Sequence, residues 1–563
     1  MSSPPRPHRQ NRAGFGQSIV VSAILGLLLV GAPALGQDSD LGTIELENTG
    51  SAAAQEEFTL GVAALHSFWY DEAVVHFRRA QEIDPDFLLA YWGEAMSHNR
   101  LLWNFEDLEA GRAALQRFGP TPQARAARAK NQREHDYLQP VEVLFGSGER
   151  TQRLLGFANA MEWLAGRYPD DEDAVALFAL TQQLITRPGI WQSKQRIRSA
   201  ALLEDLVKRH PRHPGILHYL LHAYDDPILA PLGLRAAQVY AEVAPSAPHA
   251  LHMPSHIFVQ LGEWQAAAGS NEEAYQASVD WASRKGLTPM HHDFHSLSWL
   301  AYVYLQQGRY QAAGQTLRQL GRILSAGHPP AHVMPGMGSG SGAHEMGPEQ
   351  NYHEMMARYF IDSRLWRSAP AGQRLFDVDL AGTNATLVLA VGLGAAQTGD
   401  LGRARQAAEL LGRLRQREES GGNRELAARA AVMEREVQAL IRLQEGNPEE
   451  AVRLLGEASQ IEFSLPPPSG PPHPAKPAQE LFGEVLLGLG EPAEAARQLE
   501  GALIRTPGRA LSLLAAARAA AAIGDRRLAT ERYRRLLDNW SQADPGIEGL
   551  EEARNFLAGQ GSP

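Results

Sequence analysis

The sequence predicts an all-α solenoid of helix–turn–helix pairs, because one pattern of small and large residues recurs along the chain. Near the start, the pattern comprises Leu60, Gly61, Ala73, Phe77, Ala80 and Pro85. Near the end, the same offsets recur at Phe482, Gly483, Ala495, Leu499, Ala502 and Pro507, and a further period of 34 residues adds Ala517, Ala529 and Tyr533. Between them, "IFVQLGEWQAA" and "YVYLQQGRYQAA" show the same helix–turn–helix join.

The recurring residues have a simple physical role. Small residues let two antiparallel helices approach closely, large ones fill the seam between them, and the proline ends the second helix. The pattern resembles the tetratricopeptide repeat (TPR) and covers most of residues 56–555. That resemblance implies a TPR-type helix-turn-helix solenoid whose groove is lined by the first helix of each pair.

Changes in composition divide the chain. We expect a signal peptide at 1–36, a flexible linker at 37–55 and an N-terminal TPR-like array with a histidine-lined groove at 56–365. A linker at 366–382 would join it to a C-terminal TPR-like array at 383–560. The run "LPPPSGPPHPAKP" at 465–477 is expected to be an extended Pro-rich insertion in that second array.

The N-terminus is typical of a secretory signal. Three arginines up to Arg12 precede an apolar run from Ile19 to Val30, and Ala34-Leu35-Gly36 offers a small-x-small cleavage site before Gln37. The alternative is an uncleaved anchor, for which the apolar run is short. We therefore expect a periplasmic or secreted protein that has no membrane contact after cleavage.

Composition excludes several kinds of site. The net charge of −11 and the lack of basic clusters argue against nucleic-acid binding. The chain has no cysteine, which excludes disulfides, iron–sulfur clusters and covalently attached haem. It also shows no phosphate-binding loop or dinucleotide fingerprint, so we expect no nucleotide cofactor.

Histidines are concentrated in one part of the chain. Ten of the 20 lie between residues 210 and 295. "HPGILHYLLHAYDDP", "HALHMPSHIFVQLGEW" and "MHHDFHSLSWLAYVYLQQG" should open three successive helix pairs and place histidines one turn apart on neighbouring helices. Counting back from the joins at Gly262 and Gly308, His249 and His295 occupy the same position, 13 residues earlier.

Two imidazoles one turn apart can share a divalent ion that a neighbouring helix completes. All-nitrogen sites suit copper or zinc, and six rings could hold two ions. The predicted ligands are His218, His222, His252, His256, His292 and His295, with His249, His291 and Asp225 as secondary candidates. The alternative is that these histidines make ordinary polar contacts in the groove.

The segments "HPGILHYLLHAYDDP" and "APHALHMPSHIFVQLGEW" are similar to those of a subfamily of exported bacterial TPR proteins, and more loosely to the animal tetratricopeptide repeat protein thirty-eight family. Neither likeness implies a catalytic assignment. Two functions remain open: an exported scaffold with a copper or zinc site, either a metal store or a metal-dependent hydrolase or oxygen-using oxidoreductase, and a metal-free scaffold that binds a peptide or helix in its groove.

Overall fold

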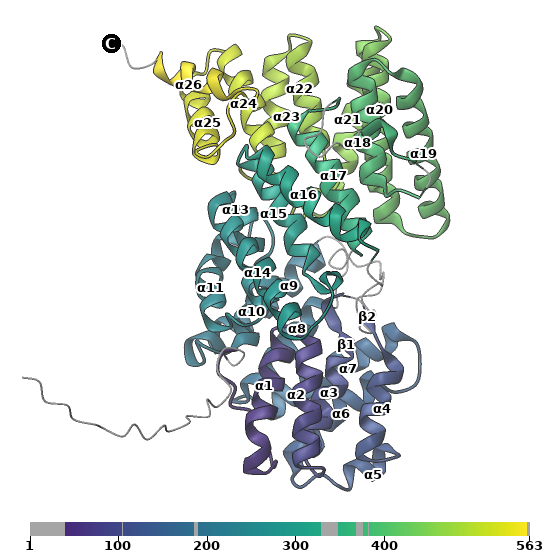
Figure 1. Ribbon diagram of the computed structural model, residues 1–563, viewed down its shortest axis with the longest axis vertical. Helices are drawn as coiled ribbons and strands as arrows, with labels where there is room; N and C mark the ends of the chain where they lie inside the picture. Colours follow the sequence, from purple (N-terminus) through teal and green to yellow (C-terminus); the bar gives the residue numbers. More distant parts are fainter. Residues whose placement is uncertain are drawn as a thin grey trace, which may run out of the picture. The chain divides into compact units, whose positions relative to one another are not determined.

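The computed structural model describes residues 40–103, 105–184, 190–327, 347–367, 375–380 and 382–559. Within these ranges the chain is all-α apart from one pair of two-residue strands, and successive helices pack as consecutive pairs (Figure 1). The prediction of an all-α fold built from helix pairs is confirmed. The predicted signal peptide, residues 1–36, lies outside the described residues. No described helix is both long enough and apolar enough to cross a membrane.

The first eleven helices include α10, which carries the first histidine segment. They are α1 (Gln55–His66), α2 (Tyr70–Ile83), α3 (Leu88–Ser97), α4 (Leu108–Phe118), α5 (Pro122–Ala126), α6 (Gln132–Leu144), α7 (Arg150–Arg167), α8 (Glu172–Leu184), α9 (Ile190–Arg209), α10 (Pro214–Tyr224) and α11 (Ala230–Val243). The strands β1 (Asn99–Arg100) and β2 (Phe105–Glu106) form an antiparallel pair, and the short 3-10 helices are η1 (Ala52–Ala54), η2 (Leu101–Trp103), η3 (Pro289–His291) and η4 (Leu375–Asp377).

The remaining helices continue the series. They are α12 (Pro248–His252), α13 (Pro254–Leu261), α14 (Trp264–Arg284), α15 (Phe294–Gln306), α16 (Tyr310–Ser325), α17 (Pro348–Ser363), α18 (Ala385–Thr398), α19 (Leu401–Ser420), α20 (Arg424–Gln444), α21 (Pro448–Ser464), α22 (Ala478–Gly488), α23 (Pro492–Arg505), α24 (Ala510–Ala522), α25 (Arg526–Asn539) and α26 (Leu550–Ala558).

The repeat residues pack as their sizes require. The ring of Phe77 on α2 lies against Gly61 on α1, where an added Cβ would come within 2.9 Å of the ring. Leu499 on α23 covers Gly483 on α22 in the same way, at 2.5 Å. The glycine in each first helix is therefore needed for the close approach of the second helix.

The three histidine segments begin helices, and local capping sets each start. His213 caps α10, its Nδ1 accepting the Ile216 amide, and Pro214 takes the first helical position. Pro254 likewise begins α13, which ends at Gly262 with a left-handed φ of 68°. The Asp293 carboxylate caps α15 by accepting the Ser296 amide. The sequence therefore fixes where each histidine enters its helix.

Two segments expected to be linkers pack against the helices instead. Leu41 and Leu46, in the expected linker 37–55, are buried, and the Thr43 amide donates to the Arg212 carbonyl. Leu375 and Leu380, in the expected linker 366–382, belong to a buried core that runs from Val259 to Ala519. Apolar side chains at these positions favour burial over an exposed linker, so the core continues across the expected boundary.

The Pro-rich segment 465–477 contains no helix, as expected, but it is not an exposed linker. Its backbone carbonyls accept hydrogen bonds from Gln260 Nε2 (Pro468, 2.7 Å) and Arg358 (Pro472, 3.3 Å). Gly470 lies against the Trp299 indole so closely that an added Cβ would come within 2.3 Å of it. The segment thus packs on the helices that carry the histidines.

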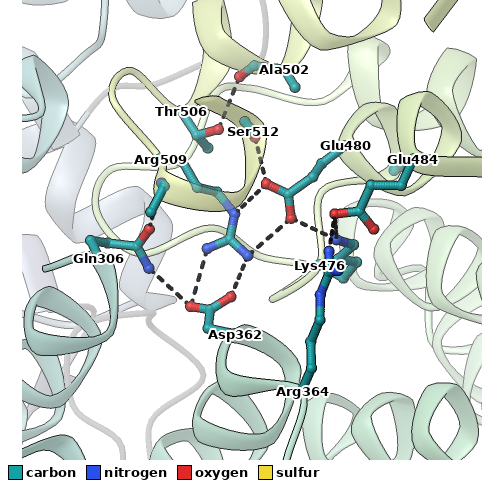
Figure 2. A network of polar contacts seen from close by, with 12 residues as sticks. Gln306, Asp362, Arg364, Lys476, Glu480, Glu484, Ala502, Thr506, Arg509 and Ser512 are labelled. Atoms are coloured by element: carbon teal, nitrogen blue, oxygen red, sulfur yellow. Dashed lines mark hydrogen bonds and ion pairs between the residues drawn. The ribbon is translucent and has the colours of Figure 1, made fainter. Parts of the chain in front are cut away.

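A buried ionic network joins helices on both sides of the expected boundary (Figure 2). The Arg509 guanidinium lies between Asp362 on α17 and Glu480 on α22, with 2.8 Å from its Nε to Glu480 Oε2. Lys476 Nζ also donates to Glu480, at 2.8 Å. Gln306 Nε2 on α15 donates to Asp362, so the network reaches the third histidine helix.

Candidate metal centre

Two groups of three histidines converge where α10, α12, α13 and α15 meet. The first histidine cluster comprises His218 and His222 on α10 and His249 on α12. His218 Nε2 lies 3.1 Å from the Nε2 atoms of both His222 and His249. His218 and His222 are buried, whereas His249 is partly exposed.

The second histidine cluster repeats this arrangement one helix pair later. It comprises His252 on α12, His256 on α13 and His295 on α15. The Nε2 atoms of His252 and His256 are 3.1 Å apart, and one ring nitrogen of each member lies within 4.8 Å of the others. Rings of the two clusters are themselves close, with 6.1 Å between the centroids of His222 and His256.

The outward-facing Nδ1 atoms of three of these rings contact oxygen acceptors. His218 Nδ1 lies 2.7 Å from the His66 carbonyl, and His252 Nδ1 lies 2.7 Å from Asn271 Oδ1. The Asn271 amide nitrogen donates to the Ala267 carbonyl, which leaves its Oδ1 to accept. His256 Nδ1 lies 2.8 Å from the Asp225 carboxylate. Since all three partners accept, each Nδ1 carries the proton.

In a neutral ring that tautomer leaves Nε2 with a lone pair. His218 Nε2 has one lone pair but two histidine neighbours, and His252 and His256 direct lone pairs at each other across 3.1 Å. These lone pairs would be ligands for a cation placed between the rings. Two nitrogens bound tetrahedrally to one zinc ion lie about 3.3 Å apart, because each zinc–nitrogen bond is about 2.0–2.1 Å. The observed spacing is close to that value.

Burial keeps His218 and His249 of the first histidine cluster uncharged. Desolvation lowers the pKa of His218 to about 3, although its hydrogen bond to the His66 carbonyl opposes the shift. Desolvation and the neighbouring histidines lower the pKa of His249 well below its usual range. At neutral pH these rings are therefore in the unprotonated form that binds metal ions.

The carboxylate of Asp225 supports the second histidine cluster from behind. Burial disfavours its charge, but the hydrogen bonds from His256 Nδ1 and Gln260, together with the nearby Arg196, outweigh this effect and lower the pKa of Asp225. Gln260 Nε2 also donates to this carboxylate, at 3.2 Å. Asp225, predicted as a secondary candidate ligand, thus contacts His256 Nδ1. This position is typical of a carboxylate that orients a histidine ligand.

The structure brings five of the six predicted principal ligands into the two clusters, and His249 takes the place expected of His292. His292 Nδ1 contacts the Tyr275 hydroxyl at 3.3 Å, and His291 Nδ1 lies 3.3 Å from the Thr288 carbonyl. Both line the cavity beside the clusters. The equal spacing of His249 and His295 from their glycines is the sequence signal that places each as the third ring of a cluster.

Comparisons with known proteins add little to this geometry. The chain is similar to the crystal structure of yeast Tom70, with 11% identity over 90% of this chain and 89% of that chain and a TM-score of 0.27. It is also similar to the TPR domain of P58(IPK), with 13% identity over 91% of this chain and 100% of that chain and a TM-score of 0.19. No family model and no curated protein matches the chain. Such low TM-scores carry no argument about the site.

Two aromatic residues pack against the histidine clusters and were not predicted from the sequence. The Phe68 ring packs edge-on against His218, with centroids 4.3 Å apart, and stacks on His249 at 5.7 Å. Its backbone has a φ of 55°, a left-handed conformation that a bulky residue rarely adopts. Trp299 lies against all three rings of the second cluster, closest to His256 at 4.3 Å. Neither role has a sequence signal, since both depend on side-chain packing between helices.

The described residues contain two further groups with metal-ligand character. In the first, Asp173 accepts from His66 Nε2 at 2.8 Å and from His213 Nε2 at 3.2 Å. His213 Nδ1 accepts the Ile216 amide and His66 Nδ1 contacts the Tyr219 hydroxyl, so both rings are satisfied by protein groups. These hydrogen bonds join α1 to the start of α10. The second group, Glu45, Glu172 and His210, is partly exposed.

Proposed function

We propose that this chain is a repeat scaffold that holds two transition-metal ions, one in each histidine cluster. The observation that carries the proposal is the orientation of the rings: the Nδ1 atoms of His218, His252 and His256 donate outward to fixed oxygen acceptors, while one ring nitrogen from each member of a cluster lies within 4.8 Å of the others. Hydrogen bonds of this kind are what orient histidine ligands in metal sites. A peptide-binding groove has no need for buried nitrogens that face one another.

Copper and zinc fit these donors best. Imidazole nitrogens suit both ions, whereas magnesium and calcium prefer oxygen ligands. Three protein ligands per ion leave coordination positions open, as in catalytic zinc sites rather than structural ones. Bound zinc would activate water for hydrolysis, whereas a bound copper pair would react with oxygen. The identity of the metal therefore selects between the two reaction classes.

Elemental analysis tests the proposal directly. The chain 37–563, without an affinity histidine tag, should bind two copper or zinc ions, one per cluster. His222→Ala should remove the first ion and the double variant His252→Ala/His256→Ala the second, with the helical circular dichroism unchanged. His135→Ala is the matched control, because this histidine is partly exposed and lies outside both clusters. Two ions retained in the triple variant would overturn the assignment.

We also propose that the protein acts outside the cytoplasm. This proposal is supported by the basic stretch, apolar run and cleavage site in residues 1–36. Mass spectrometry of the protein recovered from a periplasmic fraction should give an N-terminus at Gln37. A full-length chain confined to the cytoplasm would contradict it.

A further inference from the structure

A cavity of about 340 Å³ lies directly beside both histidine clusters. Two rings from each cluster form part of its wall: His222, His249, His256 and His295. Ions held by the two clusters, as proposed above, would therefore lie beside this cavity. Its volume is that of a site for a small molecule rather than for a folded partner.

The rest of the wall is strongly aromatic. Phe68, Trp69, Tyr70, Trp103, Trp281 and Phe294 all line the cavity. Trp103 stands edge-on to Phe68, with centroids 5.5 Å apart, and edge-on to His249 at 5.4 Å. The aromatic faces and edges on this wall suit contact with another flat ring.

The charge of the proposed ions sets a second requirement for the ligand of this cavity. Each ion would be bound by neutral imidazoles, so its positive charge would not be neutralised by its protein ligands. Two carboxylates near the ligand rings, Asp225 behind His256 and Asp293 at the start of α15, offset only part of that charge. Arg100 and Asp71 lie 3.8 Å apart on the cavity wall, so this pair adds no net charge, and Glu349 lines the wall as well. A ligand that brings a negatively charged oxygen to the metals is therefore favoured.

We propose that the cavity binds phenols, with the ring against the aromatic wall and the oxygen directed at the histidine clusters. The juxtaposition of the aromatic wall and the two histidine clusters carries this inference, which rests on the proposed metal centre. Cyclohexanol makes poorer contact with flat aromatic faces, because its ring is puckered. Small carboxylates such as acetate offer a negatively charged oxygen to the metals but have no ring to contact the aromatic wall.

Calorimetric titration of the zinc-loaded protein tests the inference, because zinc is redox-inert and permits binding to be measured without oxidation. Phenol should bind at least about tenfold more tightly than cyclohexanol or acetate, a difference of about 1.4 kcal/mol. This preference should be lost after removal of zinc. Trp103→Ala should weaken phenol binding while retaining both ions, whereas Trp163→Ala, whose residue is half exposed and away from the cavity, should change neither.

The possible failures are distinguishable because metal content is measured on the same samples. Two bound ions with equal affinity for phenol and cyclohexanol, or for phenol and acetate, would overturn the phenol site and leave the metal centre standing. Absence of bound zinc or copper would overturn the metal centre and the phenol site together.

Discussion

At the scale of single residues, the carboxylate behind His256 is the group whose removal should be most informative. Asp225 accepts from His256 Nδ1 and from Gln260, so it fixes the ring whose Nε2 faces His252. Asp226, its neighbour in sequence, instead accepts the Ile228 amide near the surface. The two aspartates offer a matched comparison.

Asp225→Asn should weaken metal binding at the second histidine cluster by roughly 10- to 100-fold, as expected for loss of a ligand-orienting carboxylate. The measurement is chelator competition in a His222→Ala background, where the second cluster alone is intact. Asp226→Asn should leave the affinity unchanged. Equal effects of the two substitutions would show that Asp225 acts through overall stability.

Phe68 combines a buried ring with a left-handed backbone. Replacing it with alanine or glycine removes the same contacts, but glycine adopts positive φ without steric conflict. We expect Phe68→Gly to be more stable than Phe68→Ala by about 1 kcal/mol in urea unfolding, since the left-handed conformation costs other residues about 1–2 kcal/mol.

The buried Phe157 lies inside the regular helix α7 and provides the opposite case. Here Phe157→Gly should be less stable than Phe157→Ala by about 1 kcal/mol, because glycine is disfavoured in a helix interior. If the alanine variant is more stable than the glycine variant at both positions, the backbone at Phe68 is not strained.

At the scale of elements, the metal centre lies where two buried cores meet. One core runs from Leu41 to Ile257 and the other begins at Val259, so the division falls inside α13. The Pro-rich segment 465–477 then covers this junction through Pro468, which accepts from Gln260, and Gly470, which lies against Trp299. A segment 208 residues away in sequence therefore supports the second histidine cluster.

Gly470→Ala should displace the segment, because the new Cβ would come within 2.3 Å of the Trp299 ring. We expect metal affinity at the second cluster to fall by roughly tenfold, since Trp299 and Gln260 position its rings and its carboxylate. Chelator competition in the His222→Ala background measures this. Gly456→Ala on α21 is the control, because nothing lies within 4 Å of its added Cβ. An unchanged affinity would show that the segment does not position the cluster.

At the scale of the whole molecule, buried charges join the helices that precede and follow residue 366. Arg509, Lys476 and Arg364 are matched by Asp362, Glu480 and Glu484 (Figure 2). Burial disfavours the charge of Glu480, but Arg509 and Lys476 outweigh this and hold its pKa below the usual range. The network is stable because each buried charge has an opposite partner.

Arg509→Met should destabilise the protein by about 3–5 kcal/mol, because Asp362 and Glu480 would remain buried with one cation fewer. Urea unfolding followed by circular dichroism measures the change. Arg527→Met is the control: its side chain is 83% exposed and its ion pair with Glu531 spans 3.6 Å, so a loss of about 0–1 kcal/mol is expected. Similar values for both variants would show that the network does not join the two parts.

The local features of this protein follow from its sequence. Periodic small and large residues predict the helix pairs, because Gly61 and Gly483 must admit Phe77 and Leu499. Prolines and capping side chains set the starts of α10, α13 and α15. A spacing of four residues places His218 with His222 and His252 with His256 on single helical faces.

Tertiary structure decided which residues complete each cluster. The choice of His249 over His292, and the position of Asp225 behind His256, depend on how neighbouring helices are rotated against each other. The packing of residues 465–477 on Trp299 depends on contacts between distant parts of the chain. Periodicity describes each helix by itself, whereas convergence of six rings is a property of helices packed together.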